Sequence, residues 1–234
     1  MRIIIIALIG LVFFSNTANA HTCSTEKVKC PIDGKTVEFC VTMSMTTFGS
    51  FYDFQKKGAI GNHYEELINS CPKCHFSGYL SDFKKNYTKD ERNKIKNFLI
   101  KYKEWEINDV TECQIAAEIK GFKNQKNDDI ANCYLIGSYL IRTDTTKIIL
   151  REKFQIKTEK YLILAIKNNE YEDISVIATI NYLIAEMNRR TRNFDKAILH
   201  YEKAINDPNK KDWVEKVATK QKKIALKKDD DNSI

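Results

Sequence analysis

The chain of 234 residues contains little glycine and proline, with 8 Gly and 3 Pro. Sandwiches and barrels built from many short strands need more of both residues, because glycine and proline supply the backbone conformations of tight turns. We therefore do not expect an all-β fold. Hydrophobic residues make up 43% of the chain. That is enough to bury a core, which argues against a disordered chain and against a disulfide-held mini-protein.

Histidine is also scarce, and no single region collects the positive charge. The chain has 4 His, with no pair at helical spacing, so it gives little support to a hydrolase with an open catalytic zinc held by histidine and carboxylate ligands. Lys and Arg outnumber Asp and Glu by 38 to 31, but the lysines are scattered along every helical segment. This pattern is typical of a solvated surface, and we expect no nucleic-acid partner. No catalytic signature occurs, so an enzyme is the less favoured class.

The first twenty residues have the three-part pattern of a secretory signal peptide. A positive start is followed by an uncharged apolar run at 3–14 and a small polar stretch that ends in Ala18-Asn19-Ala20. Twelve residues span only about 18 Å as a helix, which is short of the hydrocarbon core of about 30 Å. We therefore expect cleavage after Ala20, no transmembrane segment after cleavage, and a secreted or periplasmic protein in a compartment where thiols tend to oxidise.

The remaining chain divides by composition near Tyr87. Residues 21–87 hold five of the seven cysteines and two of the three prolines, whereas residues 88–228 contain only Gly121, Gly137 and Pro208 as helix breakers. We therefore predict a cysteine-rich head over 21–87 and an almost entirely helical domain over 88–234.

Periodic apolar residues place the helices of the second region. Residues 88–91 (TKDE) form a capping box, and apolar residues recur after it at three- and four-residue spacings. Six further helices are expected, joined by short polar links as helical hairpins. Their predicted ranges are 111–122, 129–142, 146–168, 173–191, 194–206 and 210–227.

The segment at 192–209 is similar to the second half of a tetratricopeptide repeat. Ala197 and Ala204 allow a neighbouring helix to approach closely, Tyr201 fills the gap between them, and Pro208 ends the helix. Asn188 stands where the preceding helix of a repeat has an aromatic residue, so an ordinary amphipathic helix pair is the alternative. The predicted fold class is mainly α, a tetratricopeptide-like helical array with a small zinc-ribbon-like α+β head.

Two short sequences in the head look like the metal-binding turns of a zinc ribbon. Cys30-Pro-Ile-Asp33-Gly and Cys71-Pro-Lys-Cys74-His share the Cys-Pro start, but Asp33 stands where a second thiolate is usual. We predict a structural zinc site with three sulfur ligands and one further ligand. The fourth ligand is Asp33 or Cys40, and two weaker candidates are Cys23 and His75.

Other uses of the cysteines stay open at this point. Cys71 and Cys74 form either a disulfide or a redox-active dithiol, and the alternative function is a periplasmic thiol-disulfide oxidoreductase that uses both of them. The motif lacks the βαβ context of a thioredoxin fold. Cys113 and Cys133 fall on consecutive predicted helices, so they form either a disulfide or two buried free thiols.

Residues 43–54 are dense in aromatics and are predicted to form a loop. Such a loop covers the metal turn or offers a surface to a partner, and packing in the core is the favoured role of its Phe and Tyr residues.

Several of these motifs together resemble DUF2225, an uncharacterised bacterial domain-of-unknown-function family. The resemblance covers nearly all of the chain after residue 20, and its motifs are the first Cys-Pro turn, Asp53, the segment 71–79 (CPKCHFSGY), Asp82-Phe83 and the segment 189–194 (RRTRNF). It implies paired cysteine turns that hold zinc, followed by tetratricopeptide-like helices, and it implies no activity. We therefore predict an exported module that binds a protein or peptide partner.

Overall fold

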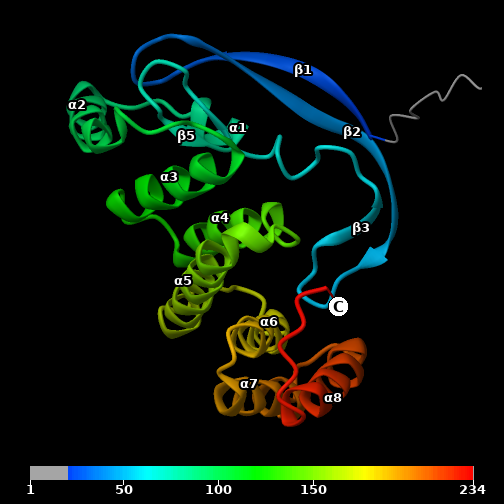
Figure 1. Ribbon diagram of the computed structural model, residues 1–234. Coiled ribbons are helices and arrows are strands. Elements are labelled where there is room, and N and C mark those ends of the chain that lie inside the picture. The colour runs from blue at the N-terminus through cyan, green and yellow to red at the C-terminus, as the bar shows by residue number, and fades with distance from the viewer. Residues whose placement is uncertain (1–20, 234) are drawn as a thin grey trace, which may run out of the picture.

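The computed structural model describes residues 21–233, so the predicted signal peptide at 1–20 lies outside the described residues. Figure 1 shows helices stacked one on another along the chain, with the strands at one end and along one side. The strands are β1 (His21–Lys29), β2 (Thr36–Ser50), β3 (Lys56–Ala59), β4 (Asn69–Ser70) and β5 (Ser77–Gly78). The helices are α1 (Leu80–Phe83), α2 (Lys89–Leu99), η1 (Ile100–Tyr102), α3 (Asp109–Phe122), α4 (Asn127–Leu140), η2 (Thr145–Lys147), α5 (Ile148–Lys167), α6 (Val176–Arg190), α7 (Phe194–Asn206) and α8 (Asp212–Leu226).

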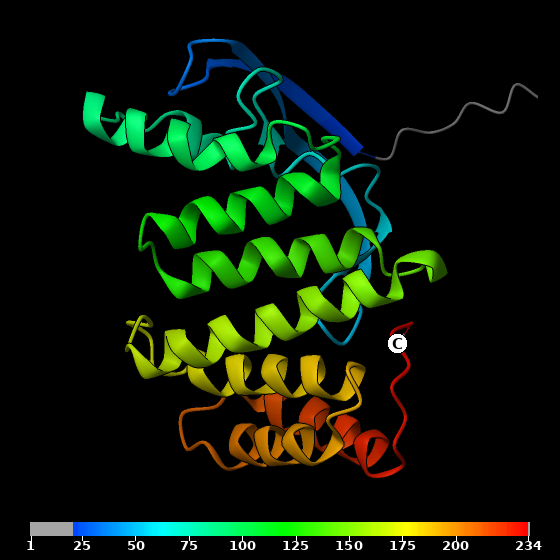
Figure 2. The ribbon, with the colours of Figure 1, turned by 60° about the vertical axis from the view of Figure 1, so that its left-hand side comes forward.

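The chain is therefore mainly helical with a small antiparallel sheet, as the sequence predicts at that level. Each of the seven longer helices overlaps a predicted range, and their boundaries agree to within a few residues. The capping box at the start of α2 is present, with the Thr88 hydroxyl accepting from the Glu91 amide at 3.2 Å and the Glu91 carboxylate accepting from the Thr88 amide at 2.7 Å. Consecutive helices from α3 to α8 pack against one another as layers, which Figure 2 shows from the side.

The prediction of a loop over residues 43–54 is wrong for most of its length. Residues 36–50 form the single long strand β2, which pairs antiparallel with β1 on one side and with β3 on the other. Four threonines and two valines along residues 36–50 favour strand conformation. Phe48 is 74% exposed, whereas Phe54 packs against Tyr182 of α6 and Trp213 of α8. The long strand thus carries residues 51–55 to the far end of the helical stack (Figure 1).

The hydrophobic core crosses the compositional boundary near Tyr87. One buried cluster joins Tyr64 and Ile68 of the head to residues of α3, α4, α5 and α6. A second joins Phe39 and Cys71 to residues of α2 and α3. Because burial of apolar side chains stabilises a fold in proportion to the area removed from water, the head and the first helices stabilise each other directly.

Alternating small and aromatic residues hold the last three helices together. Ala197, Tyr201 and Ala204 of α7 are fully buried, as predicted from the sequence, and they face Tyr182 on α6. On α6 the same spacing occurs in Ala178, Tyr182 and Ala185, which belong to the same cluster. Small residues let the helices approach closely, and the two tyrosine rings fill the space between them.

None of the helices within residues 21–233 combines the length and the apolar character needed to cross a bilayer.

Candidate functional site

The first metal-binding turn has the tight backbone of a knuckle. The Cys30 amide donates to the Lys35 carbonyl at 2.7 Å, and the Gly34 amide donates to the Cys30 carbonyl at 2.9 Å. Gly34 has a φ of 75°, in the left-handed region where glycine is favoured. The turn directs the Cys30 sulfur and the Asp33 carboxylate to the same side.

The second turn repeats this backbone geometry. The Cys71 amide donates to the Phe76 carbonyl at 2.9 Å, and the His75 amide donates to the Cys71 carbonyl at 3.0 Å. His75 occupies the position of Gly34 and has a φ of 59°. The two turns therefore form equivalent pairs, in which Cys30 corresponds to Cys71 and Asp33 corresponds to Cys74.

The four side chains converge on one point. Cys30, Asp33, Cys71 and Cys74 place one donor atom each within 4.8 Å of one another, so the group is able to hold a metal ion. The Cys30 and Cys74 sulfurs are 3.6 Å apart, and the Cys71 sulfur lies 3.4 Å from Asp33 Oδ1. A tetrahedral zinc ion with Zn–S bonds of about 2.3 Å and a Zn–O bond of about 2.0 Å separates two sulfurs by about 3.8 Å and a sulfur from an oxygen by about 3.5 Å. These two distances are therefore close to those of a tetrahedral site.

The three cysteines of this group shift one another's pKa. Hydrogen bonding to Cys30 and to Cys74 lowers the pKa of Cys71, and hydrogen bonding within the same group raises the pKa values of Cys30 and Cys74. Because cysteine binds a metal as the thiolate, a divalent cation at this group would release protons.

Helix α3 and the residues before it hold the second turn in place. The Ser70 amide, which precedes the turn on β4, donates to the Glu112 carboxylate of α3 at 3.0 Å. The His75 ring nitrogen Nδ1 lies 3.0 Å from the Tyr102 carbonyl. Burial raises the pKa of the Glu112 carboxyl to about 7. Because the His75 ring contacts the Tyr102 carbonyl, it does not join the group of donors around Cys71.

A buried ion pair fixes the segment that follows the second turn. The Lys120 ammonium of α3 lies 2.8 Å from Asp82 Oδ2, and both side chains are 6% exposed. Asp82 Oδ2 also accepts from the Tyr79 amide at 3.1 Å. A Cβ atom at Gly78 would lie 2.8 Å from the Asp82 Cβ, so only glycine fits there. This contact gives a physical reason for the glycine and the aspartate of the 71–83 segment.

Cys40 is not placed as the fourth ligand. It forms a disulfide with Cys23, which crosses the antiparallel pair of β1 and β2. His21 and Glu66 lie near Cys40 as a second potential ligand group, but its sulfur is already bonded. Of the two candidates from the sequence, Asp33 is the one that the structure brings to the three sulfurs.

Cys113 and Cys133 are both free and buried, so the second of the two alternatives for this pair is the one present. Burial raises the pKa of Cys133 to about 12 and raises that of Cys113 as well. Because the thiolate is the reactive form, both sulfurs behave as apolar core atoms between α3 and α4.

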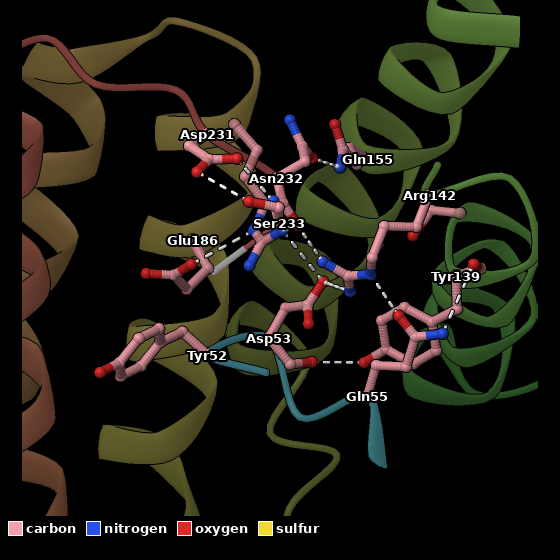
Figure 3. Close-up of polar contacts among 12 residues, drawn as sticks. Tyr52, Asp53, Gln55, Tyr139, Arg142, Gln155, Glu186, Asp231, Asn232 and Ser233 are labelled. Atoms are coloured by element: carbon pink, nitrogen blue, oxygen red, sulfur yellow. Dashed lines mark hydrogen bonds and ion pairs between the residues drawn. The ribbon is translucent and has the colours of Figure 1, made fainter. Parts of the chain in front are cut away.

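A buried cluster of charges lies where the chain after β2 meets α4 and α6, and no local pattern in the sequence predicts it. Asp53, which follows β2, pairs with Arg142 at the end of α4 and lies 3.6 Å from Arg190 of α6. Glu186 accepts from Arg189 at 3.1 Å and from Arg190 at 3.2 Å. Figure 3 shows residues 231–233 of the C-terminal tail lying against this cluster. Asp53 and the two adjacent arginines occur in the motifs of the family resemblance, but nothing in their spacing predicts that they meet.

The fold and the site define a mainly helical protein whose N-terminal region brings four potential metal ligands together in two turns. The chain belongs to the family described as "Uncharacterized protein conserved in bacteria (DUF2225)", whose model matches residues 23–225. The matched range contains all four residues of the metal centre, and the resemblance stated from the sequence is confirmed. No curated protein and no solved structure matches the chain.

Proposed function

We propose that this protein is an exported protein-binding module whose head is held by a structural zinc ion. The observation that carries the proposal is the convergence of two equivalent turns on one point, with donor atoms at tetrahedral spacing. The surroundings of that point favour a structural role over a catalytic one. Cys30 and Cys71 are 2% and 0% exposed, and four protein ligands fill a tetrahedral shell, so there is no open position for a substrate.

The disulfide supports the exported location. Disulfides persist in oxidising compartments and are rare in the reducing cytosol. The Cys23–Cys40 bond of β1 and β2 therefore agrees with the signal-peptide pattern of residues 1–20. A secreted or periplasmic protein is the location that both observations favour.

The helical array supplies the binding surface in this proposal. Stacked helical hairpins of the tetratricopeptide kind form extended grooves that bind peptides, and the repeated spacing of small and aromatic residues on α6 and α7 supports that relationship by analogy of fold. An open groove of about 430 Å³ crosses α2, α3, α4 and α5. Its walls combine two pairs of stacked aromatic rings with three lysines and one glutamate, namely Phe98 with Phe122, Tyr134 with Tyr161, and Lys101, Lys153, Lys157 and Glu118. Lys101 pairs with Glu118 at 2.8 Å, so Lys153 and Lys157 are the lysines that face a partner's negative charge.

The groove fits a partner segment that has apolar and acidic side chains. Aromatic rings supply contact area at low cost in conformational entropy, and the lysines favour negative charge. Phe122 is 43% exposed although it is a large apolar residue, so its ring is accessible to a partner.

Site-specific photo-crosslinking in cells tests the proposal. A photo-crosslinking amino acid at position 122 should capture one defined protein in the export compartment, whereas the same amino acid at position 226, where Leu226 is 60% exposed, should not. Substitution of the three groove lysines by glutamate should abolish the adduct at position 122. Equal capture at both positions, or none at either, would contradict a partner site in this groove.

The thiol-disulfide oxidoreductase remains the alternative, and it can be tested separately. The pairs among the described strands are antiparallel, and Cys71 and Cys74 lie in a turn between β4 and β5, not at the start of a long helix. A redox enzyme of the thioredoxin type uses the opposite arrangement. Disulfide reductase activity that disappears in a folded Cys71→Ser variant would favour the enzyme over the structural site.

A further inference from the structure

The C-terminal tail, residues 229–233, lies against three arginines that bind its main chain. Arg189 Nη1 donates to the Asp229 carbonyl at 3.0 Å and to the Asp231 carbonyl at 3.1 Å. Arg190 Nη1 donates to the Asn232 carbonyl at 2.8 Å, and Arg142 donates to the same carbonyl. We call these three arginines, with Gln155, the arginine groove.

Most of the recognition in the arginine groove is independent of the tail's side chains. The three arginines contact main-chain carbonyls, and one side-chain contact accompanies them, from Gln155 Nε2 to Asn232 Oδ1 at 2.7 Å. The tail inserts no apolar side chain into a core. A segment held by main-chain carbonyls can be replaced by another extended segment that presents carbonyls at the same spacing.

Positive charge at the arginine groove extends to its rim. Its three arginines are almost fully buried, and each of them has Asp53 or Glu186 as a carboxylate partner. A further arginine, Arg192, stands exposed at the rim, where it favours a negatively charged segment. The tail supplies three consecutive aspartates, and Asp230 lies 3.8 Å from Arg192 at the rim.

Several buried polar atoms at the arginine groove have no partner among residues 21–233. They are Asp53 Oδ1, Gln155 Oε1 and Arg189 Nε, on side chains that are 1%, 2% and 0% exposed. Unsatisfied buried polar atoms are costly. Two of these atoms are acceptors and one is a donor, so they call for the N–H and C=O groups that a peptide main chain carries.

The position of the tail in the chain agrees with a separate occupant. All three arginines lie within residues 23–225, which the family model matches, whereas the tail lies beyond that range. A surface cavity of about 510 Å³ lined by Arg192, Phe194 and Lys228 also lies beside the point where the chain leaves α8. A bound segment therefore has room to continue past the tail's own start.

We propose that the arginine groove is a binding site for an extended acidic segment of another protein, and that the chain's own tail fills this site in the absence of the partner. The proposal rests on the proposed function in one respect, since it takes the helical array as a protein-binding scaffold. The arginine groove lies at α4, α5 and α6, apart from the residues around Phe122, and the tail competes with the partner for it.

The test uses a chain that folds with its tail and loses it afterwards. A specific protease site is inserted between Lys227 and Lys228, the purified full-length protein is cut, and the tail is removed by dialysis. Fluorescence anisotropy then measures binding of a labelled peptide with the sequence of residues 229–234. The cut protein should bind this peptide, and the uncut protein should bind it at least fiftyfold more weakly because its own tail occupies the site.

A matched pair of variants locates the binding. Gln155→Ala removes the hydrogen bond to Asn232 and should weaken peptide binding by about five- to tenfold. Gln114→Ala removes a comparable bond on α3, from Gln114 Nε2 to Glu118 at 2.9 Å, and should leave the affinity unchanged. Equal affinities of the two variants would overturn the assignment of the site.

Unlabelled hexa-aspartate tests whether a foreign segment fits. It should displace the labelled tail peptide from the cut protein, and hexa-lysine should not. If the cut protein binds the tail peptide but hexa-aspartate does not compete, the groove only closes the chain's own end and the proposal fails. If the cut protein does not bind the tail peptide, the proposal fails too, while photo-crosslinking at position 122 would still report on the proposed function.

Discussion

The carboxylate of Asp33 provides the sharpest test of the metal centre. Asp33 is one of the four ligands in the proposed zinc site, and its oxygen lies 3.4 Å from the Cys71 sulfur. Apparent free energies of zinc binding to structural sites are about 10–16 kcal/mol, so one ligand in four accounts for about 3–4 kcal/mol. Because 1.4 kcal/mol is a factor of ten, Asp33→Ala should weaken zinc binding by about 100- to 1,000-fold.

Replacement of Asp33 by cysteine should have the opposite effect. The two turns share their backbone hydrogen bonds, so a sulfur at position 33 should take the place that the Cys74 sulfur has in the second turn. A thiolate is a soft ligand suited to zinc. Asp33→Cys should therefore bind zinc at least as tightly as the natural chain.

Competition with a chromophoric chelator measures the zinc affinity of each protein. Cobalt(II) in place of zinc gives a sulfur-to-metal charge-transfer band. In the natural chain its intensity should correspond to three sulfur ligands, and in Asp33→Cys it should be higher. Asp207→Ala is the control, because Asp207 accepts from the Asn209 amide at 2.8 Å just as Asp33 accepts from the Lys35 amide at 3.0 Å. A zinc affinity in Asp33→Ala within threefold of the control would refute the reasoning.

The disulfide, a crowded helix contact and a half-buried histidine each have a measurable effect on the free energy of unfolding. Removal of the Cys23–Cys40 bond, which closes a separation of 17 residues, should cost about 3 kcal/mol in the free energy of unfolding by urea, with no change in zinc content. Gly137→Ala should destabilise by about 1–3 kcal/mol because its Cβ would lie 2.5 Å from the Phe154 ring, whereas Gly121→Ala, with nothing closer than 3.9 Å, should be neutral or slightly stabilising. Burial lowers the pKa of His200 to about 4. Below about pH 6.5 this histidine is therefore protonated in the unfolded chain but stays neutral in the folded chain until about pH 4. The free energy of unfolding should fall by about 1–2 kcal/mol from pH 6.5 to pH 4, after allowance for partial exposure of the ring. A natural chain and a His200→Gln variant with the same pH dependence would contradict that assignment.

The helices were predictable because their signals are local. Apolar residues recur at three- and four-residue spacings over long segments, and a capping box or a proline marks several ends. The three sulfur ligands and Asp33 were predictable for the same reason, since each turn contains its two ligands within four residues. The convergence of the two turns depends on tertiary structure. The similarity between their sequences was the only signal that indicated it.

The disulfide was not predictable, because the pairing of Cys23 with Cys40 depends on strand register. The metal-binding turn of residues 30–35 separates β1 from β2, and Thr25, not Cys23, is the residue directly opposite Cys40. Nothing in the sequence fixes that register. The arginine groove was missed for a related reason, because arginines at a helix end and an acidic terminal run are usually solvated. Here Asp53 arrives from a strand more than a hundred residues earlier in the chain and draws Arg190 into the interior.

The odd number of cysteines is now explained by the position of each sulfur. Two form the disulfide, three belong to the group that could hold a metal ion, and two are buried thiols between α3 and α4. The odd sulfur arises because Asp33 stands where the second turn has Cys74. In the oxidising compartment that we propose, three different conditions then keep the cysteines from further thiol oxidation. One pair is already oxidised, burial suppresses the thiolates of Cys113 and Cys133, and the remaining three sulfurs depend on their metal. The redox alternative is therefore a property of the metal-free head alone, because a cation bound by Cys71 and Cys74 removes both from thiol-disulfide exchange.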